Sequence, residues 1–191
     1  MSLVRKIAIG LVLSMASQIC AASNLSLGLT LGQSSFDEIN NACVPISFLD
    51  IDCDGADDSD SAIGINLALN ITENWGVEVG YVDFGEFSTG IRFGSDNSTL
   101  QVGAEAGYVS AVGTLPISEF LSVSARLGAF TASGDITSSG FVSAFTEYEE
   151  DLAAVIGASV DFRLTSKLAL QARYDSYDEL DLASVGIKYF F

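Results

Sequence analysis

The sequence predicts an all-β fold, an eight-stranded antiparallel up-and-down β-barrel that spans a membrane. Three observations lead to this prediction. Apolar residues alternate with small or polar residues at a period of two through eight segments of the chain. The connections between these segments alternate strictly between short and long. After residue 22, no apolar run is long enough to cross a bilayer as a helix.

Each predicted strand has a greasy face of Leu, Ile, Val and aromatic residues and an opposite face dominated by Gly, Ser and Ala. In the fourth strand, we assign Ala104, Ala106 and Tyr108 to the greasy face and Glu105 to the small and polar face. The eight predicted strands cover residues 25–33, 62–72, 75–84, 99–114, 121–129, 154–164, 168–175 and 183–191.

The composition of the second face decides which face lies inside. A soluble barrel or sandwich would present Lys, Glu and Thr to water on that face, but here it carries small residues. Small residues fit a narrow lumen, so the greasy face is expected to meet lipid. Ten residues of about 3.3 Å each, tilted by about 40°, span roughly 25 Å, the height of the apolar band in such barrels. The alternative is a soluble periplasmic barrel that binds an apolar ligand, with the leucines lining its cavity.

The connections agree with the membrane prediction. Trp75 and Tyr189 lie near the end with short connections, and Tyr81 and Tyr174 lie toward the other end, which is typical of two aromatic girdles. The short connections are 72–74, 115–119 and 164–167, and the long ones are 34–61, 85–98, 132–150 and 176–181.

Residues 1–22 are predicted to be an export signal that is removed from the mature protein. Two basic residues precede a short apolar stretch at 7–16, and small residues follow at 20–22. We expect cleavage near Ala22, which leaves 23–191 as a single outer-membrane β-barrel domain.

The cysteines are interpreted in the light of this export signal. Cys20 raises the alternative of a lipoprotein, but bulky Ile19 precedes it and Ser17 stands where a lipobox carries Leu. After the signal, two cysteines remain, Cys43 and Cys53. An even number in an exported chain predicts a disulfide that closes a short loop, the alternative being two free thiols.

At this point the chain resembles the OmpA-type family of small outer-membrane barrels. The resemblance covers nearly all of the mature chain and rests on the eight alternating strands and on the stretches 75–85, 112–119 and 185–191. It implies a transmembrane barrel domain. The sequence departs from the family in one respect, because no peptidoglycan-binding domain follows Phe191, and we therefore expect no wall-tethering role. The resemblance also implies that Ile187, Tyr189 and the C-terminal Phe191 form the signal read by the barrel-assembly machinery.

The small and polar face also collects charged residues. Because a charge in a low-dielectric lumen needs a partner, we predict an ion-pair network there. It pairs the acids Glu78, Glu105 and Asp161 with the bases Arg126, Arg163, Arg173 and Lys188, and Gln171 shares the same face. A gated polar pore is one interpretation. We favour an ion-paired plug, because eight strands leave an interior just filled by side chains.

The first long connection is acidic and contains no basic residue. Within it, Asp50, Asp52 and Asp54 match the opening of a calcium-binding loop, whose carboxylates supply hard oxygen ligands. The twelfth position is Ser61, where an EF-hand carries Glu. Calcium at these aspartates is therefore weighed against a solvated acidic loop, and no other cofactor is expected.

Composition argues against most other functions. With 25 acidic and 8 basic residues and a net charge of −17, the chain lacks the basic surface that nucleic acid requires. It has no histidine, so a Ser-His-Asp arrangement is impossible and we expect no enzyme.

We therefore expect a monomeric protein of a Gram-negative outer membrane. Its predicted role is structural or adhesive, through acidic extracellular loops. Its expected partners are outer-membrane lipid, lipopolysaccharide and the barrel-assembly machinery. A narrow channel for ions or small solutes is the alternative function.

Overall fold

The computed structural model describes residues 24–36, 51–57, 59–93, 96–139, 144–149, 152–178 and 180–191. The signal prediction for 1–22 lies outside these residues. Within the described part, no helix is long and apolar enough to cross a bilayer.

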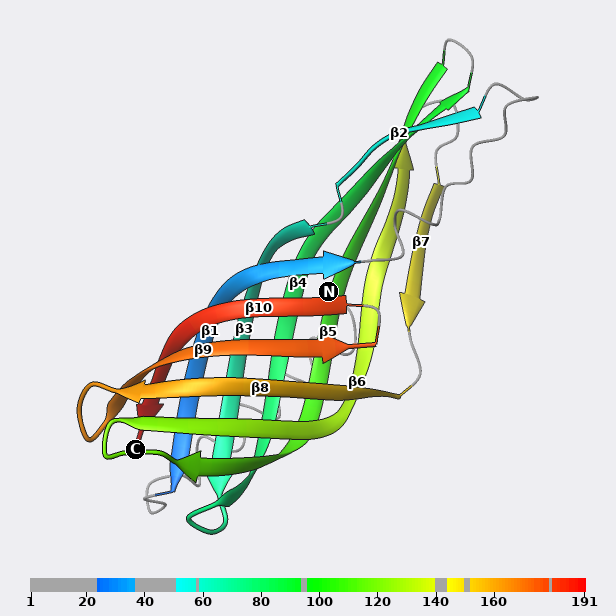
Figure 1. Cartoon of the computed structure of the whole chain (residues 1–191). Helices are drawn as coiled ribbons and strands as arrows, with labels where there is room; N and C mark the ends of the chain where they lie inside the picture. Colours follow the sequence, from blue (N-terminus) through cyan, green and yellow to red (C-terminus); the bar gives the residue numbers. More distant parts are fainter. Residues whose placement is uncertain are drawn as a thin grey trace.

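Eight antiparallel strands close into a barrel, which confirms the predicted fold class (Figure 1). The order around the wall is β4-β3-β1-β10-β9-β8-β6-β5, and pairing of β5 with β4 closes it. The wall strands are β1 (Leu25–Phe36), β3 (Ser59–Asn70), β4 (Trp75–Phe93), β5 (Asp96–Pro116), β6 (Leu121–Ser139), β8 (Ala153–Arg163), β9 (Leu168–Tyr177) and β10 (Leu180–Phe190).

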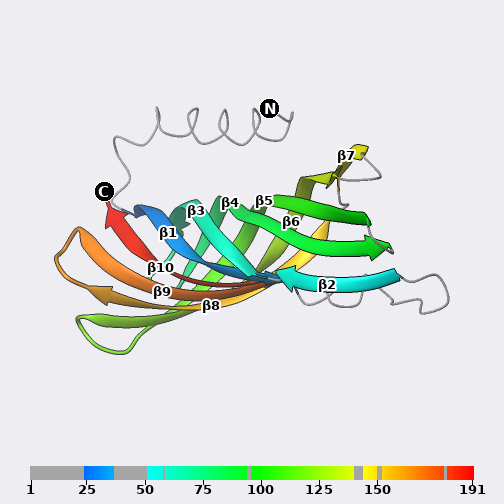
Figure 2. The same cartoon turned by 90° about the horizontal axis from the view of Figure 1, so that it is seen from above.

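The rim of the barrel is uneven, which the sequence did not predict. Strands β4, β5 and β6 continue far beyond the other wall strands (Figures 1 and 2). Two further strands, β2 (Ile51–Asp57) and β7 (Ala144–Glu149), pair with the extended parts of β4 and β6. The five strands β2-β4-β5-β6-β7 form what we call the rim sheet, which occupies much of the predicted long connections.

The opposite end is closed by three short turns at the predicted places. In each turn a backbone amide donates to a carbonyl across the hairpin, with Ile71 N to Trp75 O at 2.8 Å and Leu164 N to Leu168 O at 2.8 Å. Thr72 Oγ1 also accepts from the Trp75 amide at 3.0 Å. These contacts satisfy backbone groups that a tight turn would leave without partners.

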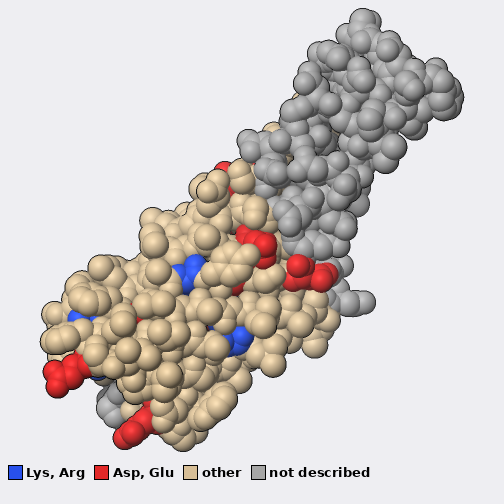
Figure 3. All heavy atoms as spheres, in the orientation of Figure 1, with Lys and Arg blue, Asp and Glu red and all other residues tan. Residues whose placement is uncertain are grey.

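The outer face is greasy, as predicted, on seven of the eight wall strands. Leu31, Ile63, Leu127 and Val185 are each more than 60% exposed there. The wall visible in Figure 3 is mostly uncharged, with acidic groups gathered toward its two ends and a few Lys or Arg atoms between. The exception is β5, described next.

On β5 the predicted faces are reversed. Ala104, Ala106 and Tyr108 are buried inside, whereas Val109 is 49% exposed on the outer face. The physical reason is size. Two alanines are small enough for the lumen, and Tyr108 fills it beside a strand that carries Gly80 at the paired position. Glu105 consequently lies on the outer face, and its predicted place in the lumen is wrong.

The rim half of the lumen is apolar. The ring of Tyr177 makes edge contacts with Phe84 and Phe130, at centroid distances of 5.2 and 5.3 Å. These rings and Phe87 are nearly fully buried. We call Phe84, Phe87, Phe130 and the ring of Tyr177 the aromatic layer.

A β-bulge joins the barrel to the rim sheet. The register between β4 and β5 shifts between Asp83 and Gly85, and Gly85 has a φ of 84°. Asp60 holds the bulge, because its Oδ2 accepts from the Glu86 amide at 2.7 Å. A side chain at position 85 would overlap that carboxylate, so glycine is required on both counts.

Candidate functional site: a charged cluster in the lumen

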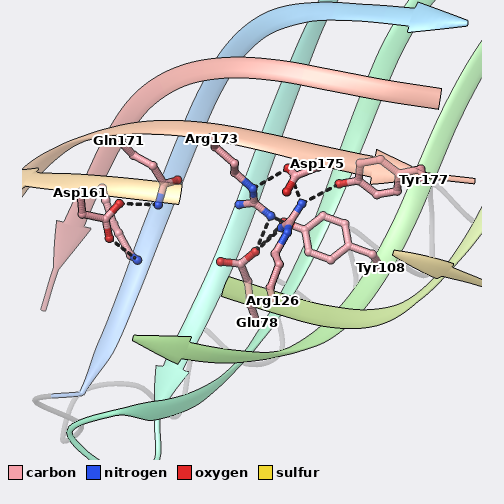
Figure 4. A network of polar contacts seen from close by, with 9 residues as sticks. Glu78, Tyr108, Arg126, Asp161, Gln171, Arg173, Asp175 and Tyr177 are labelled. Carbon is pink, nitrogen blue, oxygen red and sulfur yellow. Dashed lines mark hydrogen bonds and ion pairs between the residues drawn. The ribbon is translucent and has the colours of Figure 1, made fainter. Parts of the chain in front are cut away.

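Four charged side chains meet in the middle of the lumen, beside Tyr177 of the aromatic layer (Figure 4). Glu78 comes from β4, Arg126 from β6, and Arg173 and Asp175 from β9. Each lies on the inward face because of strand alternation, so four positions far apart in the sequence converge across the tube. We call these four residues, together with Tyr108 and Tyr177, the central cluster.

The four charges form a closed ring of ion pairs. Glu78 Oε1 accepts from Arg126 Nη1 and from Arg173 Nη2, both at 2.7 Å. Asp175 Oδ2 accepts from Arg173 Nε at 2.6 Å and also pairs with Arg126 Nη2. Each carboxylate therefore bridges both arginines, and the ring carries no net charge.

Two tyrosines complete the cluster. The Tyr108 hydroxyl donates to Glu78 Oε1 at 2.9 Å and lies 2.9 Å from Arg173 Nη2. Tyr177 OH accepts from Arg126 Nη2 at 3.1 Å. The Arg126 guanidinium also stacks 4.7 Å from the centre of the Tyr108 ring. Through Tyr177 the cluster is continuous with the aromatic layer.

Burial makes these pairs interdependent. The charged side chains are at most 5% exposed. A buried charge is tolerated only when its partners replace water, so removal of one member leaves the others uncompensated. The arrangement therefore fixes which strand positions can lie next to one another.

Glycines on neighbouring strands make room for the cluster. A Cβ at Gly157 on β8 would overlap the Asp175 carboxylate and lie 2.8 Å from Arg126 Nε. A Cβ at Gly80 would overlap the Tyr108 ring. Because the inward glycines have no side chain, they leave the space that the large polar side chains occupy.

A second polar group lies toward the short-turn end. Lys188 Nζ is 3.1 Å from Asp161 Oδ2, and Gln171 Nε2 donates to Asp161 Oδ1 at 2.7 Å (Figure 4). Here a single lysine faces a single carboxylate, and the Lys188 side chain is 13% exposed. We call Lys188 and Asp161 the lower pair, and Gln171 is its uncharged neighbour.

The structure thus divides the predicted network. It brings Glu78, Arg126 and Arg173 together and separately joins Lys188 to Asp161. The remaining two residues lie elsewhere.

Arg163 lies at the short-turn end over the ring of Phe190, 5.1 Å from its centre. Glu105, on the outer face, accepts from the Tyr81 and Ser133 hydroxyls.

Three members of the central cluster were missed. Tyr108 was assigned to the wrong face, and Tyr177 lay in a predicted loop. Asp175 was on the correct face but was left out of the network. Charge balance could have identified Asp175. Two inward arginines near Glu78 require a second acid, and Asp175 is two residues from Arg173 on the same face of the strand.

The remaining predicted sites are only partly described. Ile187, Tyr189 and Phe191 are exposed at the outer face of β10 or just after it. Asp52 and Asp54 lie on β2, which is described as backbone, whereas Asp50 lies outside the described residues. Cys43 also lies outside them, and of Cys53 only the backbone is described. The disulfide and the calcium site stay predictions.

Within the described residues, no group of three or more acidic, cysteine or histidine side chains is placed to hold a metal ion. In the central cluster, both carboxylates already form ion pairs with the two arginines. Its geometry suits a plug that holds strand register, because every charged member is engaged by other members.

The fold agrees with known proteins. The family model of the OmpA-like transmembrane domain matches residues 21–189. Ail, the attachment invasion locus protein of Yersinia pestis, superposes with a TM-score of 0.53 at 16% identity, covering 89% of this chain and 99% of that chain. No curated protein matches the chain.

Two proteins of Pseudomonas aeruginosa share the fold. The N-terminal β-barrel domain of OprF has a TM-score of 0.55 at 13% identity, covering 88% of this chain and 98% of that one. The outer membrane protein OprG has a TM-score of 0.54 at 12% identity, covering 89% and 96%. At these identities the likeness shows the fold, whereas the family match spans most of the sequence. The chain therefore belongs to the OmpA-like transmembrane domain family and has the fold of outer-membrane β-barrel proteins.

Proposed function

We propose that this protein is a non-enzymatic component of a Gram-negative outer membrane, with a structural and surface-interaction role. In this proposal the barrel is a closed anchor in lipid and lipopolysaccharide, delivered by the barrel-assembly machinery through its C-terminal strand. The rim sheet and its connections are the part that meets external surfaces.

The observation that carries the proposal is the filled lumen. The central cluster crosses the tube from β4 to β9, and the aromatic layer covers it on the rim side. Both levels are nearly fully buried. Side chains that pair with one another across the tube favour an anchor over a conduit.

The charge of the rim indicates the kind of surface. The four long connections of the sequence contain a single basic residue, Arg92, and many acids. Ail, which is named for attachment and invasion, has also been solved with a heparin analogue, a polyanion. An acidic rim repels polyanions, so cationic surfaces are the partners that fit this chain.

A narrow channel is the second candidate, and one observation favours it. The hydroxyls of Ser26, Ser110 and Ser184 are buried in the lumen and have no hydrogen-bond partner among the described residues. Such groups are suited to water. They lie on the polar side of the aromatic layer, however, so a continuous path would still have to pass that layer.

The surface role is tested with the full mature chain refolded into zwitterionic nanodiscs. A trimmed variant replaces residues 89–100 by Asn-Gly, which joins the paired positions Ser88 and Gln101 by a two-residue hairpin turn. The removed segment contains Arg92 and Asp96, so the net charge stays the same.

We expect nanodiscs with the intact protein to be retained on a polylysine surface and not on a heparin surface. The trimmed variant should keep its heat-modifiable migration but be retained more weakly, because it lacks most of the β4 positions with which the aspartate-rich strand β2 pairs. Equal retention of intact protein, trimmed variant and empty nanodiscs would refute the surface role.

A further inference from the structure

A shallow apolar depression of about 570 Å³ lies on the outer face of the wall, across β1, β10, β9, β8 and β6. Pairing of Val185 with Leu31 and with Ala172 makes it continuous from β1 to β9. The outward side chains that line it are Leu31, Val123, Ala158, Val160, Ala172, Tyr174, Ala183 and Val185. We call it the wall depression.

Alanines form the floor of the wall depression, and larger side chains project around them. The register places Tyr174 between Ala183 and Ala158, and Tyr174 is 52% exposed. A hollow between projecting side chains lets a flexible hydrocarbon chain contact the wall on several sides at once. The shape therefore suits an acyl chain better than a flat wall would.

The same part of the wall ends at the β8–β9 turn, at the left of Figure 1, with two exposed basic side chains. Three other basic side chains, Arg126, Arg173 and Lys188, pair with acids inside the lumen. By contrast, Arg163 and Lys167 have no ion-pair partner among the described residues. Positive charge is thus available at this turn, on a chain with a net charge of −17.

Lys167 lies on the lipid side of the turn. Its Nζ is 5.8 Å from the centre of the Tyr189 ring on the outer face of β10. Phe162 and Phe191, nearby at the same end of the wall, are about half exposed. A lysine among exposed aromatic rings at a strand end is typical of the level at which lipid headgroups lie. Arg163 contacts the neighbouring ring of Phe190 instead, so Lys167 is the basic group placed to meet a headgroup.

The spacing of Lys167 and the wall depression matches one lipid molecule. Lys167 and Ala172 are five residues apart. At about 3.3 Å per residue and a tilt of about 40°, this is roughly 13 Å of depth, or half of an apolar band of roughly 25 Å. Because a phospholipid extends from its headgroup level to the bilayer centre, a lipid whose phosphate contacts Lys167 brings its acyl chains to the depression.

We propose that the β8–β9 turn and the wall depression form one site for an anionic phospholipid, with Lys167 on the phosphate and an acyl chain over the alanines. The inference rests on the proposed function, in which the wall stands in lipid, and it names a lipid partner of that wall. Lys167 supplies the preference for a negative headgroup. The depression holds the chain of any phospholipid, so the two parts of the site make separable contributions.

Charge disfavours a second copy of this chain as the occupant. Copies in one membrane share an orientation, so a two-fold axis along the bilayer normal would bring both depressions together with the two Lys167 side chains at the same level. Like charges would then face each other in a medium that screens them poorly. An anionic lipid meets the same lysine with opposite charge.

The test is native mass spectrometry of the mature chain, refolded into detergent micelles and titrated with phospholipid. Phosphatidylglycerol is the anionic probe, and phosphatidylcholine with the same acyl chains is the zwitterionic one. We expect one molecule of phosphatidylglycerol per barrel to bind about fivefold more tightly than phosphatidylcholine, which is the contribution of one basic residue near a charged lipid surface.

The headgroup contact is tested by charge. Lys167→Gln should weaken phosphatidylglycerol binding by about fivefold and leave phosphatidylcholine binding unchanged. Arg92→Gln is the matched control, because it removes the same charge from β4 in the rim sheet, and should change binding by less than about twofold. Glu119→Gln should strengthen phosphatidylglycerol binding, since the carbonyl of the next residue, Phe120, accepts from the Arg163 amide and places this acid beside the turn.

The acyl-chain contact is tested by filling the depression. Ala172→Phe should weaken both lipids alike, by about threefold or more, because the new ring occupies the floor. Ala111→Phe is the matched control at an exposed position on the outer face of β5, outside the depression. It should change neither affinity by more than about twofold.

Equal affinity for the two lipids would remove the headgroup contact, and equal effects of Ala172→Phe and Ala111→Phe would remove the acyl-chain contact. Either result overturns the proposed site. A dimer in the spectra that Ala172→Phe dissociates would make a second copy the occupant and overturn it as well. Retention of zwitterionic nanodiscs on polylysine is measured without anionic lipid, so the surface role would stand or fall separately.

Discussion

Charged side chains fill the lumen at one level, the central cluster, and aromatic rings fill it at the next, the aromatic layer. The two levels differ in how strictly each side chain depends on its partners. In the central cluster every charged side chain depends on particular partners, as Glu78 depends on both Arg126 and Arg173. In the aromatic layer, Phe130 contacts Tyr177 through ring edges that many apolar side chains could partly replace. The ion pairs therefore determine the register of the strands, and the aromatic rings close the lumen.

The largest expected effect comes from breaking the charged ring. Arg126→Leu leaves Glu78 and Asp175 facing Arg173 alone, and should lower the free energy of unfolding by about 3–5 kcal/mol. Urea unfolding in lipid vesicles, followed by the fluorescence of the single tryptophan Trp75, measures this. The double variant Arg126→Leu/Asp175→Leu restores charge balance and should be more stable than the single variant. Simple additivity of the two substitutions would contradict the proposed interdependence.

The aromatic layer should behave differently. Phe130→Ala is expected to cost about 3 kcal/mol, through lost burial and a partly closed cavity. In the double variant Arg126→Leu/Phe130→Ala, the two losses of unfolding free energy should nearly add, with a small deviation because both residues contact Tyr177. No substitution that changes charge should restore the stability of Phe130→Ala. Rescue of Phe130→Ala by Asp175→Leu would erase the distinction between the two levels.

A glycine substitution tests the space around the cluster. Gly157→Ala should cost about 1–3 kcal/mol, because the new Cβ overlaps the Asp175 carboxylate. Gly107→Ala is the matched control, since a Cβ at Gly107 meets no atom within 4 Å. Equal stability of the two variants in the same urea titration would mean that Asp175 is free to move.

The smallest effect is expected at the lower pair. Lys188→Gln should cost about 1 kcal/mol, because Gln171 still donates to Asp161 and solvent reaches the Lys188 side chain. A loss as large as that of Arg126→Leu would show that the two polar groups act as one network.

The sequence was sufficient for the barrel and for the kinds of residues in its lumen. Alternation predicted the outer face on seven wall strands, because Leu, Ile and Val stand opposite Gly and Ser. It failed on β5, where Tyr108 resembles a lipid-facing aromatic until a glycine on the neighbouring strand is known to leave room for it. The partners of each charge could not be predicted, since they depend on how the strands are staggered around the tube.

The rim sheet was beyond prediction for a different reason. Its strands are rich in Gly, Ser, Thr and Asp, which are typical of loops. They extend because each pairs with a neighbour, as Phe93 pairs with Asp96 in the β4–β5 hairpin. Such pairing depends on the assembled sheet, so the sequence of a single segment shows little of the alternation that would predict a strand.

The closed lumen is tested most directly by single-channel recording of the refolded mature chain in planar bilayers at neutral pH. The filled tube predicts a flat baseline for the intact protein, with openings that appear only when the charged level and the aromatic level are both disrupted, as in Arg126→Leu/Phe130→Ala. Steady, large conductance from the intact chain would contradict the closed anchor and establish the channel instead.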